Sequence, residues 1–414
     1  MSLPSRVNMV AGLREFFAIL PAFYILTLMW WFPRGDKYVA GLTVGAILLY
    51  GCCGKWPARN KDLQRKQTPF LLASWLFVGV SVVGYAVNDG SWTELRALLV
   101  MAVYISFFWG VRFNGRVFEW VALISAMGFI TLTFSQYLST GGRIGGFINP
   151  IPYATAVGSV AVLFLAMMLF SNRGFWQRGV SGVFFILLVF ALFMTKTRGV
   201  LIPVFLVTGG LLIALLMMNK SKRLLQPLVI VLALVGFAVI AGNAFLKDRL
   251  AQTYNEYGQI TEGNYDGSMG TRLQLWLTAG ELIVQKPVLG HGNGYRDALK
   301  SMYRADSLKE RLYLFNTNHF HNQYIDTTVK KGLIGGLALL MLLGASVQMA
   351  YRSPRAPWQW YGGLAAVLVY SGSALTDVPL LHAHTIFLFF GICFFISAVD
   401  TETKHCTVIN GELF

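Results

Sequence analysis

The sequence predicts an all-α, polytopic membrane protein with about twelve transmembrane helices and one large external loop. Its 414 residues are 55% hydrophobic and only 13% charged, whereas about 25% of the residues in a typical soluble chain are charged. This composition excludes a soluble globular protein and a disordered one. The formal net charge of +15 would indicate nucleic-acid binding in a soluble protein. Here we attribute it to basic cytoplasmic loops and, in part, to an anionic substrate.

Twelve apolar segments each approach the roughly 20 residues that a bilayer core requires. They cover residues 16–33, 38–54, 69–87, 95–111, 117–138, 151–170, 180–195, 199–218, 224–246, 325–350, 358–376 and 383–399. No cleavage-type small-residue site follows the first segment, so we expect it to be a retained span. The predicted domains are then 1–246 with spans 1 to 9, the large loop 247–324, and 325–414 with spans 10 to 12 and a tail.

The distribution of Lys and Arg predicts which loops face the cytoplasm. If the N-terminus is cytoplasmic, the connections on that side carry 17 of these residues, and the short loops on the other side carry 5. The five are Arg34, Lys37, Arg143, Lys196 and Arg198. Cytoplasmic loops are the ones enriched in positive charge. We therefore expect both termini in the cytoplasm and the large loop on the external side.

The large loop has room for a small folded unit. Residues 271–286 show an apolar helical stripe and are followed by Pro287, which ends a helix. The glycine-rich run 287–294 predicts an irregular connection. Residues 295–311 predict a second, amphipathic helix, which we expect to lie on the membrane surface.

Four cationic residues on the external side are candidates for binding an anion. Lys196 and Arg198 stand beside a glycine at the end of a span, where interfacial snorkelling is the alternative. Arg143 lies in a glycine-rich run, where a structural turn is equally open. Arg272 lies near the start of a predicted helix, where the helix dipole disfavours a cation unless an anion binds beside it. A plain surface arginine is the alternative for Arg272.

Two His-x-His pairs also lie on the external side, His319 with His321 and His382 with His384. Imidazole suits a general base near neutral pH. A metal site made from the four histidines is the competing interpretation, and a loop histidine without a role is a third. No Asp or Glu accompanies them at ligand spacing, although Asp326 and Asp377 are near in sequence. We therefore expect no metal.

Motifs for ATP, dinucleotides and zinc proteases are missing from the sequence, so we expect no cofactor. An external Asp-x-Asp pair, which would hold a metal–diphosphate complex, is missing as well. If a diphosphate binds, arginines must neutralise its charge.

Four short motifs together resemble those of bacterial O-antigen ligases. The signature H-N-x9-G-x-x-G matches 321–335, T-x-[ST]-R-G matches 195–199, R-x-x-L-W matches 272–276, and P-x-x-G-x-G-x-G matches 287–294. Their order, spacing and external placement are similar to those of the family, as is the plan of twelve spans with a large periplasmic loop before the tenth. O-antigen polymerases and protein O-oligosaccharyltransferases belong to the same wider group.

Two positions depart from the pattern of the family. Thr197 stands where the family often has serine, which is a mild change. A related segment begins at Arg143 and ends at Ile151, where the family has asparagine. That second departure weakens the case for a role of Arg143.

The resemblance implies a GT-C-like, metal-independent glycosyltransferase in the bacterial inner membrane. It would transfer O-antigen polysaccharide from undecaprenyl diphosphate to the lipid A–core oligosaccharide, at a site on the periplasmic side. Arg198 and Arg272 would grip the diphosphate, and His321 would take the proton of the acceptor hydroxyl in a single inverting displacement. Asn322 would orient His321 or start the next helix. The further substrate-binding candidates are Lys196, Arg143, Asn322 and His319.

Two alternatives stay open at this stage. A polymerase or protein O-oligosaccharyltransferase of the same group would use the same motifs with another acceptor. A flippase of lipid-linked sugars would use the same arginines but would need no base, so His321 separates it from a transferase. Membrane lipids are expected partners in every case, and nucleic acid in none.

Overall fold

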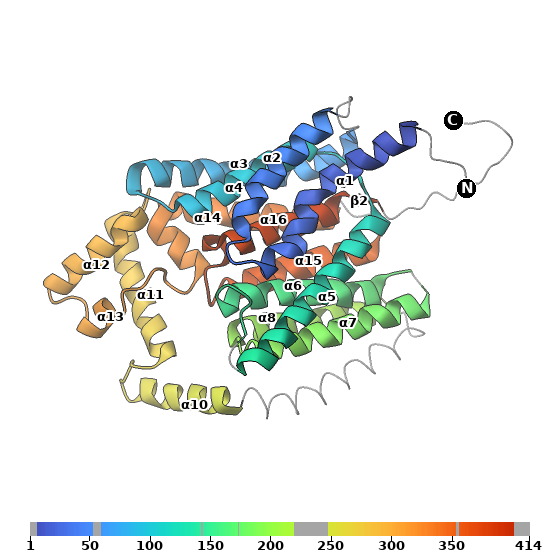
Figure 1. The fold of residues 1–414 in the computed structure, drawn as a ribbon. Coiled ribbons are helices and arrows are strands. Elements are labelled where there is room, and N and C mark those ends of the chain that lie inside the picture. The colour runs from blue at the N-terminus through green and yellow to red at the C-terminus, as the bar shows by residue number, and fades with distance from the viewer. Residues whose placement is uncertain are drawn as a thin grey trace.

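The computed structural model describes residues 6–52, 59–141, 144–172, 174–218, 247–352 and 356–400. Long helices run side by side in a bundle, and a smaller group of helices gathers at one end of it (Figure 1). The predicted span 224–246 and the candidate Arg143 lie outside the described residues.

The bundle contains twelve of the described helical elements, counting a short 3₁₀ turn. They are α1 (Arg6–Leu26), η1 (Leu28–Trp31), α2 (Asp36–Cys52), α3 (Lys61–Asn88), α4 (Trp92–Phe108), α5 (Gly115–Thr140), α6 (Pro150–Phe170), α7 (Phe175–Met194), α8 (Arg198–Met217), α14 (Gln323–Arg352), α15 (Pro357–Ser373) and α16 (Ala383–Ala398). A 3₁₀ turn, η5 (Pro379–Leu381), connects α15 to α16. Two short strands, β1 (Phe113–Asn114) and β2 (Val399–Asp400), pair in parallel.

The described helices fit an all-α polytopic membrane protein. Six of them, α3, α5, α6, α7, α8 and α14, are long and apolar enough to cross a membrane by length and composition. Helices α1, α2, α4, α15 and α16 overlap five further predicted spans. The first helix begins and ends earlier than the predicted segment 16–33, because the chain turns into η1 after Leu26. The total of twelve spans and the GT-C-like fold stay predictions.

The centre of the bundle is formed by α6 and α16. Every residue of α6 from Pro152 to Phe170 is buried, and so is every residue of α16. Helices α7, α8 and α15 pack around α6. A helix that is apolar on all sides must be buried on all sides or face lipid, and α6 is buried in protein. Gly158 permits this close packing, because a Cβ there would lie 2.8 Å from Val204.

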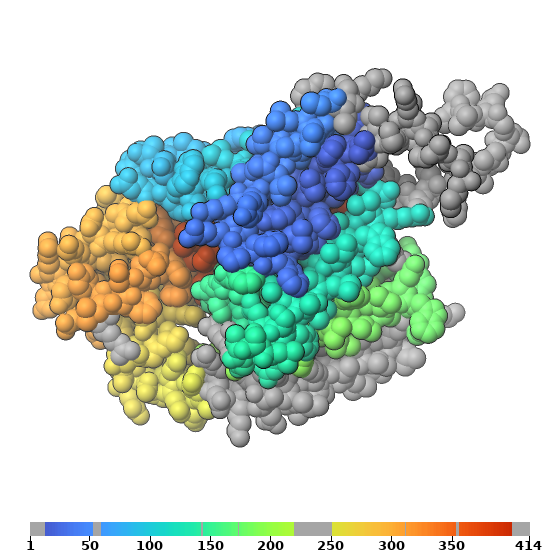
Figure 2. Space-filling model, viewed as in Figure 1, coloured from blue at the N-terminus to red at the C-terminus, as the bar shows by residue number. Residues whose placement is uncertain are grey.

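The helices at the end of the bundle form a lobe, which we define as residues 268–331. It contains α11 (Ser268–Gln285), η4 (Gly292–Gly294), α12 (Tyr295–Arg304), α13 (Glu310–Leu314) and the first part of α14. Figure 2 shows it in yellow and orange beside the blue and green helices of the bundle. Helix α10 (Lys247–Thr261) leads into it.

The lobe has its own small hydrophobic core. Leu275 and Leu282 of α11 pack with Tyr295 and Met302 of α12 and with Phe320. The prediction that the amphipathic stretch 295–311 lies on the membrane surface is therefore wrong for α12. Its apolar stripe is buried in this small core together with residues of α11, α13 and the segment before α14. Protein side chains remove apolar area from water as a lipid surface would.

Helix α14 is interrupted at Gly332, whose φ of 68° and ψ of −172° are not helical. The glycine-rich connection 287–294 fills the break. The amide of His291 donates to the carbonyl of Val329 at 2.8 Å, and the amide of Leu333 donates to the carbonyl of Pro287 at 2.7 Å. A Cβ on Gly332 would lie 2.0 Å from the carbonyl oxygen of Val288. The motif at 287–294 and the motif at 321–335 thus meet at this break in α14.

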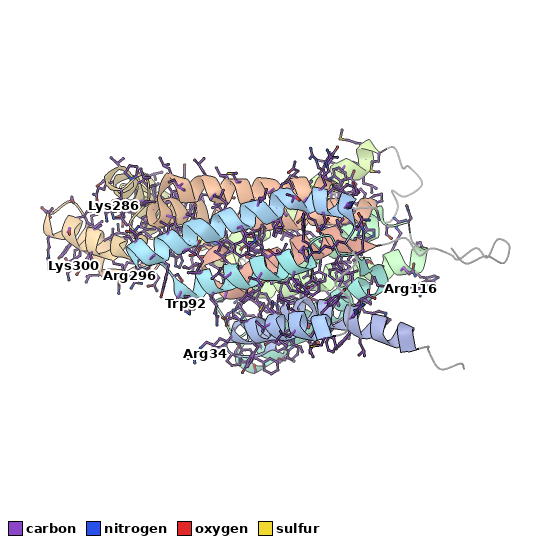
Figure 3. The ribbon with its side chains drawn as sticks, turned by 90° about the horizontal axis from the view of Figure 1, so that it is seen from above. Arg34, Trp92, Arg116, Lys286, Arg296 and Lys300 are labelled. Atoms are coloured by element: carbon purple, nitrogen blue, oxygen red, sulfur yellow. The ribbon has the colours of Figure 1, made fainter. Side chains whose placement is uncertain are left out.

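Cations that the predicted topology assigns to opposite sides of the membrane lie toward opposite ends of the bundle, and which end faces the cytoplasm stays a prediction. Figure 3 shows Arg296 and Lys300 of the lobe and Arg34 of the bundle toward one end, and Arg116 toward the other. Arg34 and the lobe are predicted to be external and Arg116 cytoplasmic. Residues assigned to one side of the membrane should share one end of the bundle, and these do.

Candidate functional site

The first cationic segment is held against the loop between α15 and α16. Arg198 is the first residue of α8 and follows Thr197, whose hydroxyl lies 2.6 Å from that of Thr195. A Cβ on Gly199 would lie 2.1 Å from the hydroxyl oxygen of Thr376, and that hydroxyl donates to the Gly199 carbonyl at 3.3 Å. The glycine of the T-x-[ST]-R-G motif is therefore needed for close approach, and the contact brings Arg198 beside the loop that carries Asp377.

Arg272 reaches the same region from the lobe. Helix α11 begins at Ser268, so Arg272 lies one turn inside the helix, and the expectation that it sits at the helix start is wrong. Its side chain is partly buried. Burial lowers the pKa of Arg272, as does the positive charge of Arg198, while Asp377 acts in the opposite direction. The two arginines, which are 74 positions apart in the sequence (272 − 198), are thus close enough to interact electrostatically.

His321 lies between the lobe core and α14 in a backbone conformation that L-residues rarely adopt, with a φ of 52°. Its Nδ1 atom is buried and has no hydrogen-bond partner among the described residues. Burial lowers the pKa of His321 to about 4, and the positive charges of His319 and Arg272 act in the same direction. The imidazole is therefore neutral at physiological pH, with one ring nitrogen unused. That is the state in which it can accept a proton.

Asn322 starts the next helix. Its side-chain oxygen accepts hydrogen bonds from the amides of Tyr324 and Ile325 at 3.0 and 3.1 Å, as an N-cap residue does. Its side-chain amide donates to the carbonyl of Leu375 at 3.2 Å. Of the two roles considered for Asn322, the structure supports the cap, which also ties α14 to the α15–α16 loop.

Asp377 is the residue that sequence reasoning missed. It is 2% exposed, and its Oδ1 atom lies 3.4 Å from Nε2 of His319. The second oxygen, Oδ2, is buried without a partner among the described residues. Burial alone would raise the pKa of Asp377, but the hydrogen bond and charge of His319 hold it below the usual value. The available signal was a carboxylate in a connection between two apolar spans that is predicted to be external.

The four histidines do not gather at one point. The rings of His319 and His321 are 4.3 Å apart. His382 interacts electrostatically with Asp377 and His319, whereas His384 faces Asp36 of α2, with its Nδ1 atom 3.9 Å from the carboxylate. A site with four histidine ligands is therefore not formed.

A different set of groups could hold a metal ion. Among the described residues, His319, His321 and Asp377 place one ligand atom each within 4.8 Å of one another. Two imidazoles and a carboxylate are common zinc ligands. The nearby positive charge of Arg272 opposes a divalent cation at this point.

A cavity of about 300 Å³ opens beside these groups. It is lined by Asp266, Gly267, Ser268, Thr271, Arg272, Gln274, Leu312, Phe315 and His321. The predicted base and one predicted anion-binding arginine therefore share a cavity, although they lie on different elements. Lys196 does not belong to the described lining of this cavity, and neither do His319 and Asn322.

Comparison with known proteins points to one family. Residues 183–340 match the family model described as O-antigen ligase. An O-antigen ligase of Escherichia coli (strain K12) is 28% identical over 192 residues, which cover 46% of this chain and 44% of that protein. An uncharacterized protein of Haemophilus influenzae is 25% identical over 140 residues, which cover 33% of this chain and 35% of that protein. The match spans less than half the length of either relative.

The matched residues 183–340 include Arg198, Arg272 and His321 and all four motifs on which the resemblance rests. The lobe and the first part of α14 lie within them as well. The chain thus carries an O-antigen ligase family domain at residues 183–340, which confirms the resemblance that its motifs indicate.

Proposed function

We propose that this protein is a glycosyltransferase that moves O-antigen polysaccharide from undecaprenyl diphosphate to a sugar hydroxyl of the lipid A–core oligosaccharide. The observation that carries the proposal is the shared cavity of His321 and Arg272 within an O-antigen ligase family domain. A base beside a cation is what this transfer requires, because a hydroxyl must lose a proton while a diphosphate leaves.

The reaction is a single displacement. The acceptor oxygen forms a bond to the anomeric carbon of the glycan while the bond from that carbon to the diphosphate oxygen breaks. The acceptor proton passes to the neutral ring of His321, which lines the cavity. Attack from the face opposite the leaving group inverts the anomeric configuration. Undecaprenyl diphosphate leaves with the electron pair, and its negative charge is stabilised by Arg198 and Arg272.

Asp377 acts as a positioning residue in this scheme. Its carboxylate contacts His319, whose ring lies against that of His321. When His321 becomes positively charged, the negative charge of Asp377 stabilises it, which is the direction in which Asp377 already shifts the pKa of His321. The same negative charge offsets part of the positive charge of the two arginines before the donor binds.

The transfer needs no metal ion in this scheme. Two arginines supply the charge that a metal would otherwise supply to a diphosphate, and guanidinium groups match phosphate oxygens in a bidentate geometry. A metal held by His319, His321 and Asp377 would occupy the ring that has to accept the proton. The base role and the ligand role of His321 therefore exclude each other.

Reconstitution tests the proposal directly. Purified protein in liposomes is supplied with undecaprenyl-diphosphate-linked glycan and lipid A–core, and the joined product is sought by mass spectrometry. We expect product with the native protein and at least about a hundredfold less with His321→Ala. Movement of the donor across the bilayer without any product, unaffected by His321→Ala, would indicate a flippase instead. Extension of the donor glycan, or transfer to a protein, would indicate the other activities of the group.

We also propose that the protein lies in the bacterial inner membrane with the site on the periplasmic side and both termini in the cytoplasm. The 17-to-5 distribution of Lys and Arg supports this orientation. In a variant without the native cysteines, a cysteine at the exposed position Lys300 should react with an impermeant thiol reagent in intact spheroplasts. A cysteine at Lys61 should not. The opposite labelling pattern would reject the orientation.

A further inference from the structure

The cavity beside His321 is lined by groups of different chemistry. Arg272 is the only cation in its described lining. Asp266 contributes a carboxylate, and Ser268, Thr271 and Gln274 contribute hydroxyl and amide groups. A carboxylate repels a phosphate at close range, so we expect a diphosphate to bind at Arg272 and not at Asp266.

The lining also includes two apolar side chains, Leu312 and Phe315. Phe315, which follows α13, is 51% exposed although it is a large aromatic side chain, and its ring lies 6.3 Å from that of His321. Leu312 is 6% exposed. A half-exposed aromatic ring in the same cavity as several hydrogen-bonding groups suits a ligand with one apolar face and a polar rim. A neutral sugar ring has these properties.

The volume limits what fits. About 300 Å³ is at the lower end of the roughly 300–1,000 Å³ that is usual for small-molecule pockets. The cavity therefore has room for a terminal sugar unit rather than for a long glycan, the rest of which must extend into solvent.

The position of His321 decides which substrate supplies this sugar. A general base must lie within hydrogen-bond reach of the proton it removes, so the ring next to His321 carries the attacking hydroxyl. The donor diphosphate must reach both Arg272 and Arg198, and Arg198 does not belong to the described lining of the cavity. The donor is thus expected to extend from Arg272 toward Arg198 at the start of α8.

We infer that the part of the cavity lined by Phe315, beside His321, is the subsite for the terminal sugar of the acceptor. The apolar face of the sugar stacks on Phe315, and its hydroxyls bind to Asp266, Ser268 and Gln274. This inference rests on the proposed transfer reaction. It extends that proposal by naming the residues that would bind the acceptor.

Two substitutions test the subsite, each with a matched control. Phe315→Ala removes the stacking surface, and Leu314→Ala removes an adjacent apolar side chain that is 69% exposed and does not line the cavity. Asp266→Asn removes the carboxylate, and Glu262→Gln changes an exposed carboxylate of the same connection. Transfer rates are measured against lipid A–core at saturating donor, and against donor at saturating acceptor. Binding of lipid A–core in detergent micelles is measured separately by microscale thermophoresis.

We expect Phe315→Ala to raise the KM for lipid A–core by about two- to tenfold, since an aromatic contact contributes roughly 0.5–1.5 kcal/mol. Asp266→Asn should raise it in the same direction, and neither should change the KM for the donor. The two control variants should behave as the native protein does.

The possible outcomes distinguish a failure of the subsite inference from a failure of the proposed function. An increased KM for the donor with an unchanged KM for the acceptor would assign the cavity to the donor sugar and overturn the inference. Unchanged constants for both substrates would show that no sugar binds there. If the native protein forms no joined product, the proposed function fails, and the binding measurement still decides the subsite. Weaker binding of lipid A–core to Phe315→Ala than to Leu314→Ala would support it, and equal binding would overturn it.

Discussion

The two His-x-His pairs have the same spacing and different environments. In the first pair, His319 contacts Asp377 and His321 lines the cavity with Arg272. In the second pair, only His382 faces that cluster, and His384 is directed to Asp36 and to the ring of Trp30, 5.6 Å away.

The difference comes from the backbone. His321 has a left-handed conformation just before α14, which turns its ring toward that of His319. The second pair runs into a helix, because α16 begins at Ala383. His382 is the N-cap residue and has an extended backbone, whereas His384 lies in the first turn of α16 and is buried in the bundle. Equal spacing in the sequence therefore does not imply a shared ligand or an equal role.

The largest expected effect separates the two pairs directly. His321→Ala should lower the transfer rate by about 10²–10⁴-fold, because no base remains for the acceptor proton. His384→Ala should keep most of the activity, since its ring packs inside the bundle. Transfer is measured on purified variants whose thermal unfolding matches that of the native protein. Comparable losses in both variants would contradict separate roles.

The next largest effect concerns Arg272, which lines the cavity together with His321 of the first pair. Arg272→Lys should lower the rate on the order of 100-fold, because a point charge replaces a bidentate group opposite the developing negative charge. Arg198→Lys should act in the same direction. Arg304→Lys, an exposed substitution on α12, is the control. Substantial activity in both lysine variants would show that these cations serve topology or solubility instead.

A smaller effect should appear in the pH profile. His321 must be neutral to accept a proton, and its pKa is lowered to about 4. The rate should therefore not depend on this group from neutral pH down to about pH 5 and should fall about tenfold per unit below pH 4. The kcat/KM profile measures this. A fall centred near the ordinary histidine pKa of about 6.5 would show that the ring is not desolvated in the working enzyme.

The smallest expected effect is the response to chelation. If His321 is a base, removal of divalent metal leaves the rate unchanged, because Arg198 and Arg272 carry the charge of the leaving group. Transfer is measured with and without EDTA at constant ionic strength. A loss on chelation that added zinc or manganese restores would make His319, His321 and Asp377 metal ligands.

The sequence predicted the elements of the site better than their arrangement. The helix predicted at 271–286 is present as α11. Asn322 caps the start of α14, which is one of the two roles expected for it. The membrane-surface helix was wrong, because amphipathicity shows that an apolar stripe needs cover but not whether lipid or protein covers it. The structure adds Asp377, whose role depends on a contact between loops more than 50 positions apart.

By itself, the sequence determined the class of the protein and supplied the candidate reactive groups. Composition and span length depend on local hydrophobicity, which the bilayer converts directly into topology. The tertiary structure alone decided which groups meet. Arg198, Arg272, His321 and Asp377 come from α8, α11, the start of α14 and the α15–α16 loop. Glycines at 199 and 332 permit the backbone contacts that join these elements, and such contacts follow from packing between distant segments, which no local pattern encodes.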